Sequence, residues 1–211
     1  MKKVIAICMV ILSLLMLVAC GKNHPSKVPA EKPVIYLYPM EETKVHVELD
    51  FNGTLTSAYP VYEKGWDVLA KPDGTLTDPE TGREYYCLFW EGVTNVPYDL
   101  TEGFVVAGED TERFLEESLK SLGLTDKEAN EFIIYWLPRM EKNAYNLISF
   151  QQETYTDNAV LTIDPAPDTL LRVFMAYKPL EASIRVIPQK LERVERTGFT
   201  VVEWGGAEIA D

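Results

Sequence analysis

Two consecutive segments with helical periodicity, in the middle of the chain, constrain the fold most strongly. The first covers residues 110–122 and has Gly123 as its C-terminal stop. The second begins at a capping box formed by Thr125 and Glu128, and Pro138 is expected to bend this helix or end it. Because both helices are amphipathic and adjacent, they should form a hairpin whose apolar side covers another layer.

The segments on both sides of this helical hairpin either alternate with a period of two or are apolar throughout, which indicates strands. Asn52 and Gly53 predict a type I′ turn, so the strands on either side of them should form an antiparallel hairpin. Gly205 and Gly206 are expected to release a short tail. The predicted strands are residues 34–39, 43–51, 54–59, 65–70, 84–90, 103–107, 147–151, 159–163, 170–177, 184–187 and 199–204. The sequence therefore predicts an α+β fold, a predominantly antiparallel β-sheet packed against a two-helix hairpin.

The N-terminus carries the most specific motif of the sequence. Two lysines are followed by an uncharged, mostly apolar run that closes on Leu17-Val18-Ala19-Cys20. A basic start, an apolar middle and small residues before a cysteine resemble the signal peptide and lipobox of bacterial lipoproteins. The run is short for a membrane span, which needs about 20 residues. A permanent transmembrane anchor and cleavage without lipid attachment are the two alternatives to lipidation.

The lipoprotein resemblance implies a location and a division of the chain. Residues 1–19 would be the signal peptide, and Cys20 would carry a diacylglyceryl group with fatty acids such as palmitate. Residues 20–33 contain Pro25, Pro29 and Pro33 and are expected to form a flexible tether. Residues 34–206 would form a single globular domain, held at the extracytoplasmic face of the cell membrane as part of the cell envelope.

Charge and cysteine content exclude several classes of function. The formal net charge of −13 repels phosphodiesters, so nucleic acid is not an expected partner. Cys87 would be the one cysteine left in the globular part, where we expect a buried and inert thiol. His46 has no second histidine near it in the sequence, and no calcium-loop spacing occurs, so neither a metal nor a cofactor is predicted.

The candidate catalytic residues are Glu91 and Glu203, each beside a tryptophan at a predicted strand end, Trp90 and Trp204. Two carboxylates about 5–9 Å apart could hydrolyse a glycosidic bond. The same residues could instead bind a sugar by stacking on the tryptophans, or the tryptophans could belong to the core with both glutamates pointing to water. Nucleophile elbows, P-loops and zinc helices do not occur in the sequence, so binding is favoured over catalysis.

A second group of polar residues, Gln151, Gln152 and Glu153 with Arg139, lies near another predicted strand end. The region from Lys32 through the Phe-Trp-Glu-Gly segment to Gly206 resembles a group of uncharacterised secreted bacterial proteins, and this resemblance implies no activity. We therefore expect a membrane-anchored extracytoplasmic lipoprotein, a binding or structural module of the cell envelope that recognises glycan or peptide. The alternative is a carboxylate-dependent hydrolase that acts on envelope or exogenous polysaccharide.

Overall fold

The computed structural model describes residues 27–210. Thirteen strands, three α-helices and one 3₁₀ helix are described in this part of the chain. In order they are β1 (Val28–Tyr38), β2 (Thr43–Phe51), β3 (Thr54–Tyr59), β4 (Trp66–Ala70), β5 (Leu76–Thr77), β6 (Glu84–Tyr85), β7 (Leu88–Thr94), β8 (Glu102–Ala107), η1 (Gly108–Asp110), α2 (Thr111–Leu122), α3 (Asp126–Met140), β9 (Tyr145–Gln151), α4 (Glu153–Thr156), β10 (Ala159–Asp164), β11 (Thr169–Leu180), β12 (Ile187–Pro188) and β13 (Thr200–Glu208).

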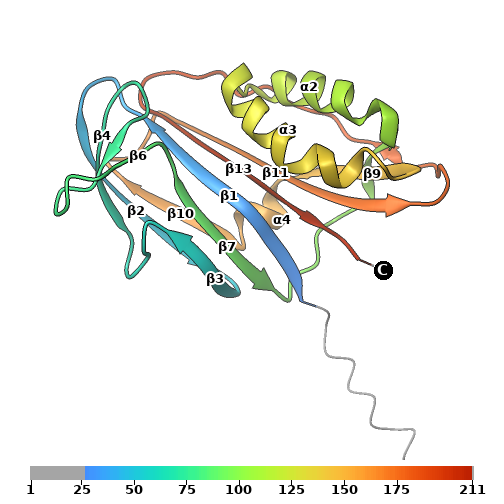
Figure 1. Ribbon diagram of the computed structural model, residues 1–211, viewed down its shortest axis with the longest axis horizontal. Coiled ribbons are helices and arrows are strands. Elements are labelled where there is room, and N and C mark those ends of the chain that lie inside the picture. Colours follow the sequence, from blue (N-terminus) through green and yellow to red (C-terminus); the bar gives the residue numbers. More distant parts are fainter. Residues whose placement is uncertain (1–26, 211) are drawn as a thin grey trace, which may run out of the picture.

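The strands form two sheets (Figure 1). The larger sheet has eight strands in the order β12-β8-β9-β11-β13-β1-β7-β3, and the smaller has five in the order β10-β2-β4-β5-β6. Most neighbouring strands are antiparallel, whereas β11 with β13 and β12 with β8 are parallel. The predicted fold class, an α+β fold of mainly antiparallel sheet with few helices, is confirmed.

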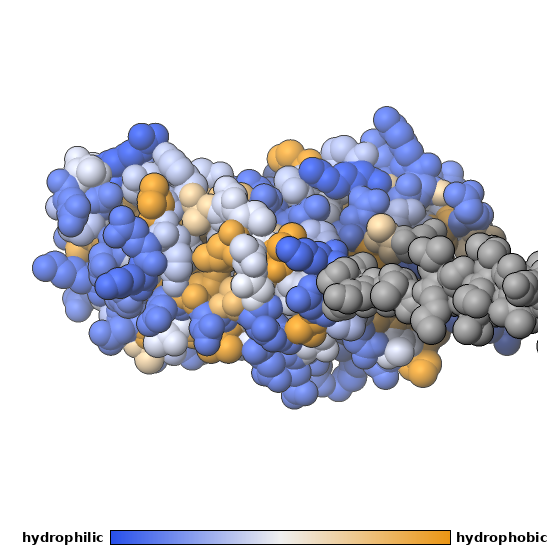
Figure 2. Space-filling view, turned by 90° about the horizontal axis from the view of Figure 1, so that it is seen from below, coloured by the Kyte–Doolittle hydropathy of each residue, from blue (hydrophilic) through white to orange (hydrophobic). Residues whose placement is uncertain are grey.

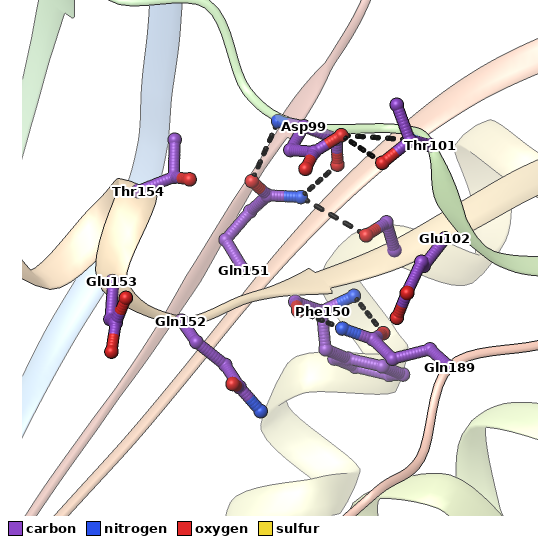
Figure 3. Close-up of a pocket in the computed structure, with 10 residues that line it drawn as sticks. Asp99, Thr101, Glu102, Phe150, Gln151, Gln152, Glu153, Thr154 and Gln189 are labelled. Carbon is purple, nitrogen blue, oxygen red and sulfur yellow. Dashed lines mark hydrogen bonds between the residues drawn. The ribbon is translucent and has the colours of Figure 1, made fainter.

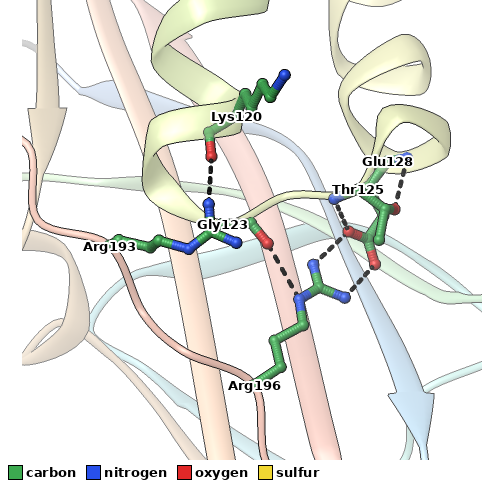
Figure 4. Close-up of polar contacts among 6 residues, drawn as sticks. All are labelled: Lys120, Gly123, Thr125, Glu128, Arg193 and Arg196. Carbon is green, nitrogen blue, oxygen red and sulfur yellow. Dashed lines mark hydrogen bonds and ion pairs between the residues drawn. The ribbon is translucent and has the colours of Figure 1, made fainter.

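Helices α2 and α3 cover one face of the eight-stranded sheet (Figure 1). Their apolar sides, including the fully buried Phe132 and Trp136, pack on residues from β1, β9, β11 and β13. The predicted capping box is present, because Thr125 and Glu128 each accept a hydrogen bond from the other's backbone N–H. Arg196, from the segment before β13, forms an ion pair with Glu128 and donates to the Gly123 carbonyl (Figure 4). Through Arg196, the segment before β13 therefore stabilises the start of α3.

The opposite face of the eight-stranded sheet packs against the five-stranded sheet. Alternation along β1 sends Ile35 and Leu37 into this core and Val34 and Tyr36 towards the helices. Strand β2 contributes Val45, Val47 and Leu49 from the other side, as its sequence pattern predicts. The β1 strand thus separates two apolar clusters, which explains why its residues are apolar at nearly every position.

The predicted hairpin around Asn52 and Gly53 is wrong. Strands β2 and β3 have the predicted bounds, but β2 pairs with β10 and β4, whereas β3 pairs with β7 in the other sheet. Asn52 does not adopt a positive φ; instead its backbone N–H and its side-chain amide both donate to Asn158. These contacts direct the chain from one sheet to the other in place of a type I′ turn.

The tether boundary at residue 33 is also wrong. Strand β1 begins at Val28, and Pro29 and Ala30 pair with Val93 and Gly92 of β7. Pairing of β1 with β7 and β13 is irregular between Ala30 and Val34, where Lys32 has a φ of 59°. Pro29 and Pro33 therefore lie within β1, because a proline fits a strand wherever its nitrogen has no ladder partner.

Two further element ends can be compared with their predictions. Of the two alternatives for Pro138, an end of the helix at this residue is wrong: α3 continues to Met140, since a proline in the last turn removes only one hydrogen bond. Strand β13 continues through Gly205 and Gly206 to Glu208, so these glycines do not release a tail. An added Cβ at Gly206 would lie 2.5 Å from the Met175 carbonyl oxygen and 2.6 Å from the Trp136 ring. Glycine is therefore required there for close packing of α3 on the sheet.

The predicted signal peptide and the lipidation site at Cys20 lie outside the described residues. Within residues 27–210, no helix has the length and apolar character needed to cross a membrane.

Candidate functional site

Glu203 lies in a buried cluster between the two sheets. Its carboxylate pairs with Arg172 at 2.7 Å and accepts a hydrogen bond of 3.1 Å from Trp90 Nε1. The side chain of Glu203 is 1% exposed and that of Arg172 is 7% exposed. The Arg172 guanidinium also lies 4.8 Å from the centre of the buried Tyr155 ring. Glu203 is thus surrounded by protein on all sides, with its charge compensated by arginine.

Glu91 lies on the other face of the same sheet. It follows Trp90 on β7, and successive side chains of a strand point to opposite faces. Its Oε1 accepts a hydrogen bond of 3.2 Å from the Lys32 backbone N–H. Its negative charge contributes to the raised pKa of Glu31 and of Tyr135 on α3, so it lies on the helix side. Glu91 and Glu203 therefore do not share a cleft, and they cannot act as the carboxylate pair of a glycosidase.

The two tryptophans are not available as stacking platforms. Trp90 is fully buried between the sheets, and Trp204 is 1% exposed beneath the helices, where its ring contacts Phe132. Of the three roles considered for these residues, a place in the core is the one that the geometry supports. The sequence could not distinguish these roles, because the burial of a tryptophan depends on which layers cover it.

A different set of aromatic side chains surrounds a cavity of about 380 Å³ on the helix-side face of the eight-stranded sheet. We call it the aromatic cavity. Its floor comes from β1 and β7, and its walls come from the end of β3 and from the segment that enters β7. The lining residues are Lys32, Val34, Tyr59, Glu84, Tyr85, Tyr86, Cys87 and Phe89. Of these residues, the buried Val34 and the partly buried Cys87 and Phe89 belong to the helix-side core, whereas Tyr59 and Tyr86 remain exposed.

Several rings of the aromatic cavity are exposed and held in fixed contacts. Tyr59 is 47% exposed and Tyr86 is 57% exposed. The Tyr59 and Tyr85 rings meet edge to face at 5.5 Å, and the Arg83 guanidinium lies 5.7–5.9 Å from both ring centres. Burial raises the pKa of the Cys87 thiol to about 11, so this sulfur is protonated and unreactive at neutral pH.

The chemistry of the aromatic cavity is that of recognition. Exposed tyrosine rings can stack on the apolar face of a sugar or enclose an apolar side chain, and their hydroxyls can form hydrogen bonds. Lys32 extends over the Phe89 ring, with its Nζ 5.4 Å from the ring centre, and Glu84 supplies a carboxylate. This site therefore offers apolar surface with a few charged groups, a usual composition for a ligand pocket.

A second cavity, of about 300 Å³, lies at the end of β9 (Figure 3). It contains three of the four polar residues grouped in the sequence, Gln151, Gln152 and Glu153. Arg139 does not join them, because it stacks on Tyr135 of α3 at 3.9 Å. Asp99, Glu102 and Glu153 give this strand-end cavity an acidic character, and no lysine or arginine lines it.

Much of the polar lining of the strand-end cavity is already used within the protein (Figure 3). The Gln151 amide accepts from the Asp99 backbone N–H at 2.9 Å and donates to the Asp99 carbonyl at 2.7 Å. Gln189 makes the same pair of bonds with the Phe150 backbone. These two glutamines hold a loop and a segment against β9. The aromatic cavity, whose tyrosine rings are exposed, is therefore the better candidate for a ligand site.

A larger hollow of about 450 Å³ is lined by aliphatic residues such as Leu122, Leu170 and Leu191, and the other exposed apolar groups are scattered. The face in Figure 2 is mainly hydrophilic, with hydrophobic side chains gathered near its middle. Exposed large hydrophobic residues such as Met40, Ile134 and Ile187 come from separate parts of the chain. Scattered exposure of this kind is ordinary for a folded protein. Within the described residues, the aromatic cavity differs because several aromatic side chains meet at one hollow.

Sequence reasoning missed Tyr59, Tyr85 and Tyr86. Residues 84–90 alternate so regularly in aromatic and apolar side chains that they predict one central strand. In the structure the segment is divided into β6 and β7, which belong to different sheets, and Tyr86 lies at the crossing between them. The adjacent Tyr85-Tyr86 pair is the one signal that could have indicated an exposed site. In a strand buried on both faces, each of the two tyrosine hydroxyls would need a buried hydrogen-bond partner.

Comparison with known proteins gives one informative match. A protein of Butyrivibrio fibrisolvens described as "Uncharacterized protein in bglA 3'region" is 42% identical to this chain over 93 residues. The match covers 95% of that protein and 41% of this chain. No family model and no solved structure matches the chain. Because nearly the whole relative aligns at this level of identity, the chain belongs to the family of that Butyrivibrio fibrisolvens protein.

Proposed function

We propose that this protein is a lipid-anchored extracytoplasmic lipoprotein whose folded part is a binding module of the cell envelope, with glycan or peptide as its ligand. The observation that carries the binding function is the aromatic cavity, where the exposed Tyr59 and Tyr86 rings surround about 380 Å³ on an open sheet face. Hydrolysis is not proposed, because Glu91 and Glu203 point to opposite faces of the sheet.

The position of the cavity is compatible with a membrane anchor. Strand β1 starts at Val28 and lines the aromatic cavity with Lys32 and Val34. At a rise of about 3.3 Å per residue, this part of β1 spans about 20 Å. A chain attached through Cys20 would therefore hold the cavity away from the lipid surface, where polymers of the envelope could reach it.

Full-length protein in detergent micelles should bind members of an array of bacterial envelope glycans and envelope-derived peptides. Tyr86→Ala should weaken the binding at least about tenfold, since buried aromatic residues dominate recognition sites. Ile134→Ala, which truncates a side chain 72% exposed on α3, is the matched control and should leave binding unchanged. Failure to bind any member of the array, or equal binding by the Tyr86→Ala variant, would contradict the proposal.

A further inference from the structure

The two sheets of the described chain have four edge strands, and β3 is the least protected. Strands β12 and β6 have only two residues each, and β12 contains Pro188. Strand β10 ends on the charged Asp164. Strand β3 has six residues, Thr-Leu-Thr-Ser-Ala-Tyr, with neither charge nor proline. Proteins usually protect a free edge by short length, charge, proline or a bulge, and β3 has only the last of these, a register shift after Leu55.

Strand β3 pairs on one side only. Its register with β7 shifts between Leu55 and Ser57, and from Ser57 to Tyr59 it is regular. In residues 27–210, no strand lies on the other side of β3. The backbone N–H and C=O groups on that side can therefore pair with another extended chain. Their regular spacing fits the main-chain groups of a strand and does not fit the hydroxyl groups of a sugar.

The free edge and the aromatic cavity meet at Tyr59. Tyr59 ends β3 and lines the cavity, and it pairs with Phe89, which also lines the cavity. Side chains directly opposite each other on neighbouring strands share one face of the sheet. A residue added opposite Tyr59 would therefore point to the same face as the cavity, beside Tyr85 and Tyr86.

We propose that β3 receives an extended peptide from a partner protein as a ninth strand, and that one aromatic or aliphatic side chain of this peptide enters the aromatic cavity. The inference rests on the proposed binding function and names its ligand class. The main-chain bonds would supply affinity, and the cavity would select the side chain.

A second copy of this chain fits the edge less well. Strands β1 and β3 are both antiparallel to β7 and therefore run in the same direction. Antiparallel pairing of two β3 strands would reverse one copy, so that the two Val28 ends would lie at opposite ends of the joined sheet. With the strands upright on the membrane, two copies anchored through the same terminus do not fit this arrangement, because one Val28 end would face away from the lipid.

The test uses full-length protein in detergent micelles and synthetic octapeptides of alternating threonine and serine, with one central residue varied. Peptides with Phe, Tyr or Leu at that position should bind at least about tenfold more tightly than the Gly peptide, since burial of such a side chain stabilises by about 1.5–3 kcal/mol. N-methylation of alternate peptide bonds should abolish binding, because it removes main-chain donors and keeps the side chains. Tyr86→Ala should remove the preference for Phe, and Val160→Ala on the β10 edge should not.

Equal binding of the N-methylated and unmodified peptides, or no preference for Phe over Gly, would overturn strand addition. Binding of envelope glycans that depends on Tyr86, without peptide binding, would overturn this inference and leave the proposed function intact. Absence of binding to both peptides and glycans would overturn both.

Discussion

At the scale of single residues, the stability of the core between the sheets depends on the buried ion pair of Arg172 and Glu203. Glu203→Gln leaves the arginine buried without a counter-charge, and we expect it to lower the free energy of unfolding by about 3–5 kcal/mol. The double variant Arg172→Met with Glu203→Gln should lose less than the single variant, because it buries no uncompensated charge. Urea denaturation of the three proteins measures the difference. A double variant less stable than Glu203→Gln would contradict this account.

Gly206 gives a second prediction at this scale. Gly206→Ala places a methyl group against the Met175 carbonyl and the Trp136 ring, neither of which can move freely, and should cost about 1–3 kcal/mol or more. Gly82→Asn is the control, because that position has open space and a φ of 71° that asparagine tolerates. Thermal unfolding should show a clear decrease in Tm for Gly206→Ala and little change for the control. Equal Tm values for wild type and Gly206→Ala would show that α3 can move away from the sheet.

At the scale of elements, the start of α3 depends on Arg196 (Figure 4). Burial opposes ionisation of Glu128, but hydrogen bonds from Arg196 and from the Thr125 backbone outweigh it and lower its pKa below 4.5. A lowered pKa in the folded state means that this stabilisation is present above pH 4.5 and is lost as the pH falls below it. Arg196→Met should cost about 3 kcal/mol at pH 6, and the difference from wild type should shrink towards pH 3. Urea denaturation at both pH values measures it.

Arg193 provides the matched control for this prediction. It donates to the Lys120 carbonyl and pairs with the exposed Glu195, so both contacts lie at the surface. Arg193→Met should change stability by less than about 1 kcal/mol at either pH. A pH-independent cost of Arg196→Met would show that the arginine acts by packing and not through the Glu128 carboxylate.

The elements also show what a sequence can predict here. Helices α2 and α3 and the capping box follow from signals within a few residues, and their prediction is confirmed. The bounds of β2 and β3 are also confirmed, but their partners are not those predicted, because pairing depends on residues such as Asn158 that lie about a hundred positions away in the chain. The aromatic cavity was missed for the same reason: its lining comes from β1, β3, β7 and the segment that enters β7, which only the sheet order brings together.

At the scale of the whole molecule, the proposed membrane anchor depends on the N-terminal sequence, and the proposed ligand binding depends on the folded part. Residues 27–210 have two apolar cores of their own, with Cys87 as their free cysteine, so we expect them to fold without the proposed lipid. The net charge of −13 disfavours adsorption to an anionic membrane surface. If the proposed anchor is present, membrane association should therefore depend almost entirely on Cys20, where two acyl chains would stabilise attachment by about 0.8 kcal/mol per buried methylene.

Cys20→Ser tests this dependence. Wild-type protein expressed in a bacterium with lipoprotein processing should remain with the membrane fraction in high salt and enter a detergent phase. The Cys20→Ser variant should leave the membrane on washing or stay as an uncleaved precursor, and it should not incorporate labelled palmitate. Cys87→Ser is the matched control and should behave as wild type, because that thiol lies in the folded part and is protonated. Palmitate labelling that survives Cys20→Ser would refute the anchor, whereas the aromatic cavity and its ligand would remain to be judged by their own binding tests.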